Sequence, residues 1–153
     1  MQSAVSAAIA ALEKDLKVTL FERNAQRVVL TEAGEAIKGG MPISGLFDLR
    51  PFRYSWLQPK LLLTHEVIEQ QSPLFHIPRQ GSLPPMLVTL GGDESAEFHR
   101  QSAAFVEAWR ASGADARTFD QPGKDHITAI AGFEDPESEL CHAVIDFMRH
   151  ATP

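Results

Sequence analysis

Three side chains capable of acid–base chemistry follow predicted strands in the second half of the sequence. The apolar run 86–90 predicts a buried strand, and the acids Asp93 and Glu94 come directly after it. Residues 114–119 predict the next strand, and His126 lies in the loop behind it. Functional side chains of α/β sheets lie in loops at the carboxyl ends of strands, so these three residues are candidate site residues. The two acids are equally suited to stabilising the start of the helix that follows them.

No serine in the sequence has the neighbours expected of a nucleophile at the end of a strand. No serine among the 153 residues stands in Gly-x-Ser-x-Gly, the turn that exposes a catalytic hydroxyl at the end of a strand. The six histidines show no metal-binding spacing such as His-Glu-x-x-His, so we expect neither a metal site nor a cofactor. The single cysteine, Cys141, excludes a disulfide framework and a Cys-rich zinc site.

The elements that must position these groups alternate between strands and helices from about residue 37 onward. Ile37–Ser44 resembles a buried strand, as do the two strands named above, and this alternation predicts a parallel sheet covered by helices. Between them, residues 51–85 are rich in proline and aromatics, with a short helix possible at Thr64–Gln71. Two amphipathic helices are predicted, Glu97–Ser112 and Pro136–His150. Their predicted packing residues are Phe98, Ala104, Phe105, Ala108 and Trp109 on the first, and Leu140, Val144, Ile145, Phe147 and Met148 on the second.

The predicted sheet has edges that could pair with another chain. Ile37–Ser44 and Met86–Leu90 have no strand predicted beside them on their outer sides. An open apolar edge invites pairing with a second polypeptide. We therefore expect either marginal stability or self-association through an exposed sheet edge.

The first 36 residues follow a different pattern. Ser3 can cap a helix over residues 4–16, and short strands are predicted near Phe21 and at Arg27–Leu30. The predicted domains are therefore residues 1–36 and 37–153. The first holds four basic and five acidic residues and the second ten and fifteen, which excludes a strongly basic nucleic-acid-binding protein. No apolar run approaches the ~18–20 residues of a membrane span, and no signal peptide is evident, so we expect a cytoplasmic protein.

The N-terminal segment resembles the winged helix-turn-helix of LysR-type transcriptional regulators. The resemblance rests on residues 2–16, on Val18-Thr19-Leu20-Phe21-Glu22-Arg23 and on Leu30-Thr31-Glu32-Ala33-Gly34. It implies that the first helix lies in the major groove of DNA and that the strand pair forms the wing, with residues 2–30 as the DNA-contacting part. Gln and Ser can hydrogen-bond base edges, and Arg can contact phosphates. The DNA-binding residues implied are Gln2, Ser3, Ser6 and Ala7 at the groove, and Arg23 and Arg27 at the backbone. The alternative is that this segment is a remnant of such a domain that only packs its apolar side chains.

Residues 38–150 resemble the C-terminal part of an α/β-hydrolase of the kynurenine formamidase and esterase-lipase group. The motifs are Gly39–Pro51, Ser72-Pro73-Leu74, Gly91–Ser102 and Gly123-Lys124-Asp125-His126. The resemblance implies that Glu94 is the acid of a Ser-acid-His triad, with Asp93 as the alternative, and that His126 is the catalytic base. It assigns a structural role to Ser44 and Asp48, in the wall behind the nucleophile.

The sequence thus predicts an α/β fold, the C-terminal half of an α/β-hydrolase preceded by a partial winged helix-turn-helix. The larger part favours a hydrolase-like protein acting on a small ester or amide, inactive alone because the nucleophile is missing. The alternative is a DNA-binding regulator whose hydrolase-like half is passive or binds a ligand. A third reading is a fusion product without a selected activity.

Overall fold

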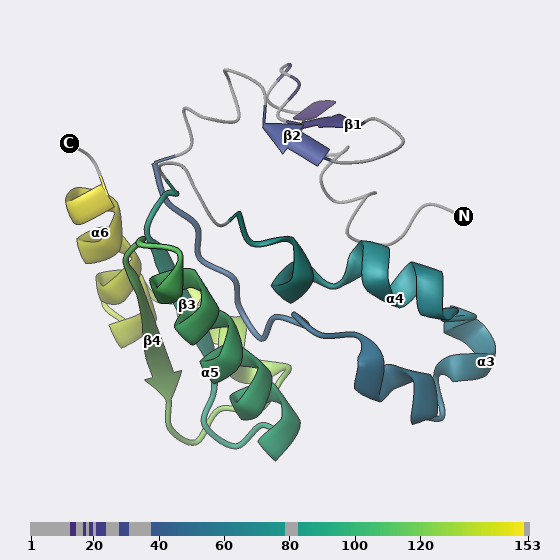
Figure 1. The fold of residues 1–153 in the computed structure, drawn as a ribbon. Coiled ribbons are helices and arrows are strands. Elements are labelled where there is room, and N and C mark those ends of the chain that lie inside the picture. The colour runs from purple at the N-terminus through teal and green to yellow at the C-terminus, as the bar shows by residue number, and fades with distance from the viewer. Residues whose placement is uncertain are drawn as a thin grey trace. The chain divides into compact units, whose positions relative to one another are not determined.

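A computed structural model describes residues 13–14, 17, 19, 21–23, 28–30, 38–78 and 83–151 (Figure 1). The chain divides into two compact units, Met1–Ile37 and Lys38–Pro153. Each unit is described separately below.

The first unit contains a short antiparallel strand pair. Strand β1 (Phe21–Arg23) pairs with β2 (Val28–Leu30), and Phe21 lies opposite Leu30. The two short strands expected in this region are therefore present. The helix predicted over residues 4–16 lies outside the described residues, apart from Glu13 and Lys14, which are helical.

The second unit is built around a parallel strand pair with a third segment beside it. Strand β3 (Met86–Gly91) pairs in parallel with β4 (Ala116–Gln121), Met86 opposite Ala116. On the other side of β3, Gly40 and Ile43 form isolated parallel bridges to Met86 and Thr89. The prediction that β3 forms an open edge is wrong, because β3 is paired on both sides.

A buried strand was also expected at Ile37–Ser44. Residues 38–44, the described part of this segment, do not form a regular strand. Pro42 has no N–H to donate, and Ser44 has a φ of 48°, which leaves the extended conformation. The ladder to β3 is therefore reduced to two bridges, and residues 39–45 are only partly buried. Ile37 lies outside the described residues.

Helix α5 (Ala96–Ala111) covers one face of the β3–β4 pair (Figure 1). Its buried residues Phe105, Val106 and Trp109 pack with Val88 and Ala116 in the main core. Phe47, from the loop after the bridged segment, stacks on Phe105 with ring centroids 4.1 Å apart. The predicted helix is confirmed. Through the contact between Phe105 and Phe47 it also holds the 46–49 loop close to the sheet.

The 3-10 helix η3 (Thr128–Glu134) contacts β3, and helix α6 (Glu139–Ala151) contacts η3. The Gln121 side chain donates both to Thr89 Oγ1 (3.1 Å) and to the Ala129 carbonyl (2.9 Å), which links η3 to both strands. On α6 only Leu140 and Phe147 are buried. The expectation that Ile145 and Met148 pack is wrong, because they are 42% and 63% exposed.

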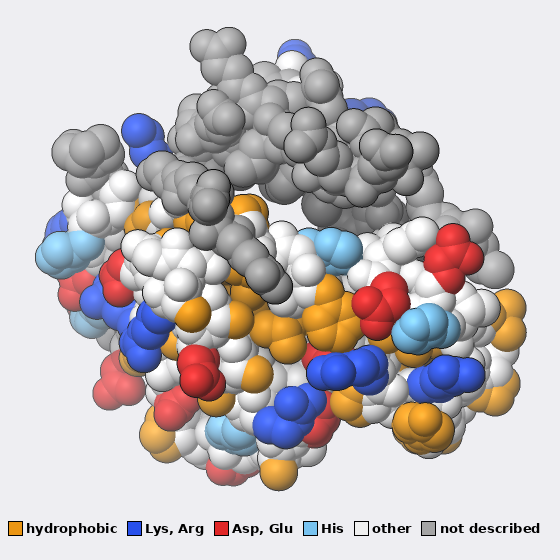
Figure 2. Space-filling model, viewed as in Figure 1, with side chains coloured by type: hydrophobic (Ala, Val, Ile, Leu, Met, Phe, Trp, Pro, Cys, Tyr) orange, Lys and Arg blue, Asp and Glu red, His pale blue; other side chains and the backbone are white. Residues whose placement is uncertain are grey.

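Four short helices fill the proline-rich region between the bridged segment and β3. These are η1 (Arg50–Tyr54), α3 (Gln58–Leu61), α4 (His65–Gln71) and η2 (Pro73–His76). The predicted helix at Thr64–Gln71 is confirmed, with Thr64 accepting the Val67 N–H as its cap. Hydrophobic side chains reach the surface over η1 and α3 (Figure 2), where Tyr54 and Trp56 are almost fully exposed.

Within the described ranges, no helix is long and apolar enough to cross a membrane.

Candidate active site

Glu94 lies in the tight turn that ends β3, with its carboxylate buried inside the protein. The Gly91 N–H and the Ser44 hydroxyl both donate to Oε1, at 2.8 and 2.5 Å. The Glu94 N–H donates back to the Gly91 carbonyl at 3.1 Å, closing the turn. Oε1 is thus held by the end of β3 and by the bridged segment. Oε2 takes part in neither of these bonds.

His126 meets that second oxygen. Its Nδ1 lies 2.9 Å from Glu94 Oε2, and 56% of its side chain is exposed while that of Glu94 is fully buried. Since an ionised carboxylate can only accept, the Nδ1–H donates, and in the neutral ring Nε2 then carries the lone pair. The arrangement gives an imidazole that is oriented from behind by a buried charge, with its opposite nitrogen available as a proton acceptor.

Hydrogen bonds to the carboxylate set the ionisation of Glu94. Burial alone would raise the pKa of Glu94, but the hydrogen bonds from Ser44, the Gly91 N–H and His126 outweigh burial and lower it. The group is therefore ionised at neutral pH, which is the state needed to stabilise an imidazolium.

The loop that carries His126 is held against the end of β3 by backbone contacts. The Asp93 N–H donates to the Lys124 carbonyl at 3.0 Å. A Cβ on Gly91 would overlap that same carbonyl oxygen and lie 2.8 Å from the Asp125 oxygen. Glycine at position 91 is therefore what allows the loop to approach closely enough for His126 to reach Glu94.

Asp125 shapes the same loop from within. Its Oδ1 accepts from the Ile127 and Thr128 N–H groups at 3.0 and 2.8 Å, and from the Thr128 hydroxyl at 2.8 Å. The backbone bond from Thr128 is the largest of the effects that lower the pKa of Asp125. An ionised Asp125 thus closes the turn around His126.

Ser44 contributes to the site in a way that its sequence context did not indicate. It is a non-glycine residue with a left-handed backbone, a conformation that costs about 1 kcal/mol and is enriched at functional sites. That conformation brings its hydroxyl onto Glu94. The family resemblance implied a place for Ser44 in the wall behind the nucleophile, and in the structure Ser44 is also a direct partner of the acid.

The structure brings Glu94 and His126 together and leaves Asp93 apart. Asp93 is exposed, and among the described residues its hydrogen bonding is through its backbone. Beside His126 stands Phe98 on the first turn of α5, with ring centroids 4.8 Å apart and the rings tilted by 39°. Phe98 was expected to be a packing residue of the helix, and no sequence signal linked it to His126.

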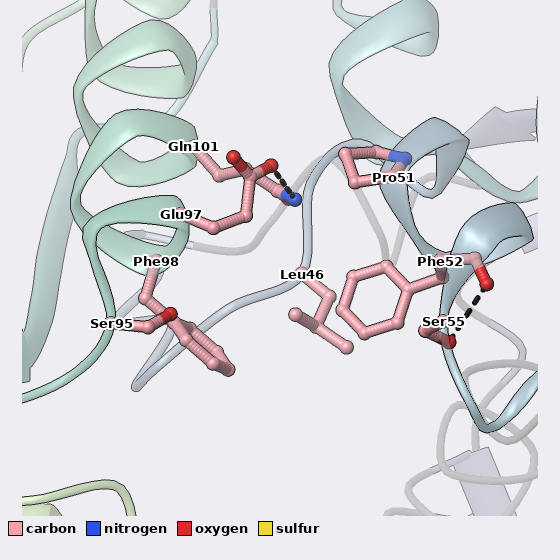
Figure 3. A pocket seen from close by; sticks show the side chains of 8 residues that line it. All are labelled: Leu46, Pro51, Phe52, Ser55, Ser95, Glu97, Phe98 and Gln101. Atoms are coloured by element: carbon pink, nitrogen blue, oxygen red, sulfur yellow. Dashed lines mark hydrogen bonds between the residues drawn. The ribbon is translucent and has the colours of Figure 1, made fainter.

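Phe98 also lines a pocket of about 260 Å³ between α5 and the 46–55 loop (Figure 3). Leu46, Phe52 and Phe98 point toward one another across it. The full lining is Leu46, Pro51, Phe52, Ser55, Ser95, Glu97, Phe98 and Gln101.

A buried polar network holds the 46–50 loop at the edge of this pocket. Gln101 Oε1 accepts the Phe47 and Asp48 N–H groups, both at 2.8 Å, and Gln101 Nε2 donates to the Asp48 carbonyl at 2.9 Å. The Asp48 carboxylate takes a forked hydrogen bond from Arg50, with Arg100 3.6 Å away. The Arg50 hydrogen bond is the main cause of the lowered pKa of Asp48. Asp48 is thus structural, as expected.

The remaining predicted site residues fall largely outside what the structure describes. In the described parts of the chain, no group of three or more His, Cys, Asp or Glu could hold a metal ion. Of the predicted DNA-contacting residues, Arg23 alone is described, and only through its backbone in β1. Gln2, Ser3, Ser6, Ala7 and Arg27 lie outside the described residues.

Comparison with known proteins matches the two parts of the chain to different families. Residues 1–35 match the family model for bacterial regulatory helix-turn-helix proteins of the lysR family. A kynurenine formamidase from Salmo salar is 28% identical over 116 residues, which are 73% of this chain and 40% of the formamidase.

Two solved structures show the same hydrolase-type fold. A protein from Silicibacter sp. TM1040 titled a thioesterase is 32% identical, with a TM-score of 0.59 over 74% of this chain and 41% of its own. An esterase from Thermogutta terrifontis is 15% identical, with a TM-score of 0.52 over 75% of this chain and 42% of its own. The second unit is therefore an α/β-hydrolase-like region, and the chain spans about two fifths of the length of these relatives.

Proposed function

We propose that the second unit, an α/β-hydrolase-like region joined to a LysR-type segment, carries the acid–base part of a site for hydrolysis of a small ester or amide. In this proposal His126 is the general base and Glu94 orients it. The observation that carries it is the 2.9 Å contact between His126 Nδ1 and the fully buried Glu94 carboxylate. The formamidase, thioesterase and esterase relatives support the substrate class.

The proposed roles follow from the position of the proton on the His126 imidazole. With Nδ1–H held by Glu94, Nε2 can take the proton of an attacking hydroxyl and later give it to the leaving group. The imidazolium formed in between is stabilised by the buried charge behind it. Ser44 and the Gly91 N–H keep that carboxylate ionised and in place.

We further propose that the 153-residue chain does not form an acyl-enzyme. Its sequence holds no Gly-x-Ser-x-Gly, so no serine is expected to stand opposite Nε2 on a strand-to-helix turn. Without a nucleophile the covalent route is lost, and only weak binding and positioning effects remain.

Two measurements test these statements separately. ¹⁵N NMR of the imidazole ring, recorded at a pH where the ring is neutral, should show the proton on Nδ1, and Glu94→Gln should move that proton to Nε2. A mixed or reversed tautomer in the unchanged chain would refute the orienting role. In a 4-nitrophenyl acetate assay we expect no burst of nitrophenol and equal rates for the unchanged chain and His126→Ala. A burst abolished by His126→Ala but kept by His142→Ala, a matched exposed histidine, would show that another nucleophile is used.

A second candidate function is DNA binding through the first unit, favoured by the match of residues 1–35 to the lysR-type family model. Arg23 and Arg27 would contact phosphates, and residues 2, 3, 6 and 7 the groove. Gel shifts with duplex DNA at low salt should show binding that weakens as salt rises and is reduced by Arg23→Ala with Arg27→Ala. No shift at low salt would exclude even phosphate-level binding.

We also propose self-association through the outer edge of the 38–45 segment. Gly40 and Ser44 direct their N–H groups to β3, so the intervening Met41 and Ile43 direct theirs away from it. No other described strand pairs with that side. Light scattering should show a dimer that Ile43→Pro converts to a monomer, and a monomeric unchanged chain would contradict the proposal.

A further inference from the structure

We propose that Thr89 and Gln121 are positioning residues of the acid–base pair, whose side chains hold the loop that carries His126 within reach of Glu94. This inference rests on the proposed function and adds to it two residues that act on the base through other groups. It follows from hydrogen bonds at both ends of the loop, and from one residue that supports both the loop and the acid.

Gln121 ends strand β4 and holds the start of the loop through its backbone. Its carbonyl accepts the Lys124 N–H at 3.2 Å and the Gly92 N–H at 2.8 Å. The first bond folds the loop back over the end of β4, and the second joins it to the turn that contains Glu94. The start of the loop is thereby fixed relative to both strands.

The Gln121 side chain holds the other end of the same loop. Its Nε2 donates to the Ala129 carbonyl at 2.9 Å. Ala129 is fully buried and donates its own N–H to the Asp125 carbonyl at 2.9 Å. Asp125 directly precedes His126 in the chain. Through Ala129, the Gln121 amide therefore sets the position of the backbone beside the imidazole.

Thr89 in the middle of β3 supplies the second acceptor for that amide. Its exposed fraction is 0%, and its Oγ1 accepts from Gln121 Nε2 at 3.1 Å while donating to the Phe119 carbonyl at 2.7 Å. A buried hydroxyl destabilises a protein unless it is hydrogen-bonded, whereas valine has nearly the same shape without that requirement. The hydroxyl at this position therefore fixes the orientation of the Gln121 amide.

The backbone of Thr89 also supports the acid. Its carbonyl accepts the Ser44 N–H at 2.8 Å, and the Ser44 hydroxyl donates to Glu94 Oε1. Thr89 is thus bonded to the support of the acid through its backbone and to the support of the base through its side chain. Together with the contact between Glu94 and His126, these bonds close a ring.

The ring matters because the contact between acid and base tolerates little movement. A displacement of the loop by about 1 Å takes the 2.9 Å distance between Nδ1 and Oε2 outside the range of a hydrogen bond. Since 56% of the His126 side chain is exposed, packing covers less than half of it. Its position therefore depends more on the loop backbone that Gln121 holds.

Imidazole ¹⁵N NMR of the full chain, at a pH where the ring is neutral, tests the inference through the ratio of the Nδ1–H to the Nε2–H tautomer of His126. The signals of this ring are identified by their absence in His126→Ala. Thr89→Val keeps the shape of the side chain and removes the acceptor, Thr89→Ser keeps a hydroxyl, and Gln121→Met removes the amide. Thr118→Val is the matched control, since Thr118 lies on β4 opposite Val88 and is exposed.

We expect Thr89→Val and Gln121→Met each to lower that ratio at least about tenfold, because a hydrogen bond to a charged group is lost. Thr89→Ser and Thr118→Val should leave it within about twofold of the unchanged chain. The double variant of Thr89→Val and Gln121→Met should lower the ratio no further than either change alone, because both break the same connection.

An unchanged ratio in Thr89→Val, an equal fall in Thr118→Val, or additive losses in the double variant would overturn the inference, provided that the variants keep a cooperative urea transition. If Thr89→Val does not fold, Gln121→Met decides by itself. A mixed or reversed tautomer already present in the unchanged chain would refute the proposed role of Glu94, and this inference with it. A correct tautomer that is insensitive to both variants would refute this inference alone.

Discussion

Replacing Glu94 with glutamine keeps the size of the side chain but removes its charge, and so isolates what the buried carboxylate contributes to stability. In the native protein the carboxylate accepts from Ser44, from the Gly91 N–H and from His126. A glutamine oxygen can still serve the first two donors. Its amide N–H then faces His126 Nδ1, which can accept it only when the ring proton has moved to Nε2.

The magnitude follows from the change in these hydrogen bonds. Bonds to a charged group contribute about 1.5–3 kcal/mol each and neutral ones about 0.5–1.5 kcal/mol. Glu94→Gln turns three hydrogen bonds to a charged group into weaker neutral ones, while it also removes the cost of burying a charge. We expect a net loss of about 2 kcal/mol in the free energy of unfolding at neutral pH.

The loss should depend on pH in a defined direction. The pKa of Glu94 in the folded protein lies below its ordinary value of 4.5. The stability that the charge contributes is therefore fully present above pH 4.5 and disappears as the pH falls through the lowered folded value. The unchanged chain and Glu94→Gln should converge in stability at acid pH.

Urea denaturation followed by tryptophan fluorescence measures this difference, because both tryptophans, Trp56 and Trp109, lie in the second unit. Asp93→Asn is the matched control: it makes the same chemical change at the neighbouring exposed acid, and we expect it to alter stability by less than about 0.5 kcal/mol. A gap between the unchanged chain and Glu94→Gln that is absent, constant with pH, or equalled by Asp93→Asn would refute the reasoning.

Substitutions at three further positions have defined outcomes. Gly91→Ala should displace the loop that begins at Lys124, because the new methyl group overlaps its carbonyl oxygen; loss of the contact between Glu94 and His126 would be read from the imidazole ¹⁵N shifts. Ser44→Ala should cost more stability in urea than Ser44→Gly, by about 1 kcal/mol, because only glycine relieves the left-handed backbone; equal losses would argue against strain. Gln101→Leu leaves two backbone N–H groups without an acceptor and should cost about 2–4 kcal/mol, measured in the same way.

Periodicity and strand-end position account for much of what could be predicted of the second unit. The 3.6-residue spacing of Phe105 and Trp109 predicted α5, and the apolar run before the glycine pair predicted β3. The same reasoning overestimated burial on α6, because apolar spacing does not reveal how wide a stripe the neighbouring elements cover. It also expected a regular strand at 38–44, where Pro42 and the backbone of Ser44 limit pairing to two bridges.

The pairing of acid and base depended on contacts between distant parts of the chain. The sequence left Asp93 and Glu94 as alternatives, since both follow the same strand and either could stabilise a helix start. The geometry of the turn buries Glu94 and exposes Asp93. Ser44, fifty residues earlier, bonds to the same carboxylate, and no local pattern could have connected them.

The sequence by itself determined the chemistry available to this protein: a carboxylate and an imidazole at strand ends, no serine in the Gly-x-Ser-x-Gly pattern, and a regulator-like segment before them. These are properties of residue type and local spacing. Only the tertiary structure decided which acid meets His126, how Gly91 admits the loop that carries it, and that Phe98 joins the pair to an apolar pocket. Those outcomes depend on close packing between segments 32 to 55 residues apart, and such packing is decided by distances in space rather than by positions along the chain.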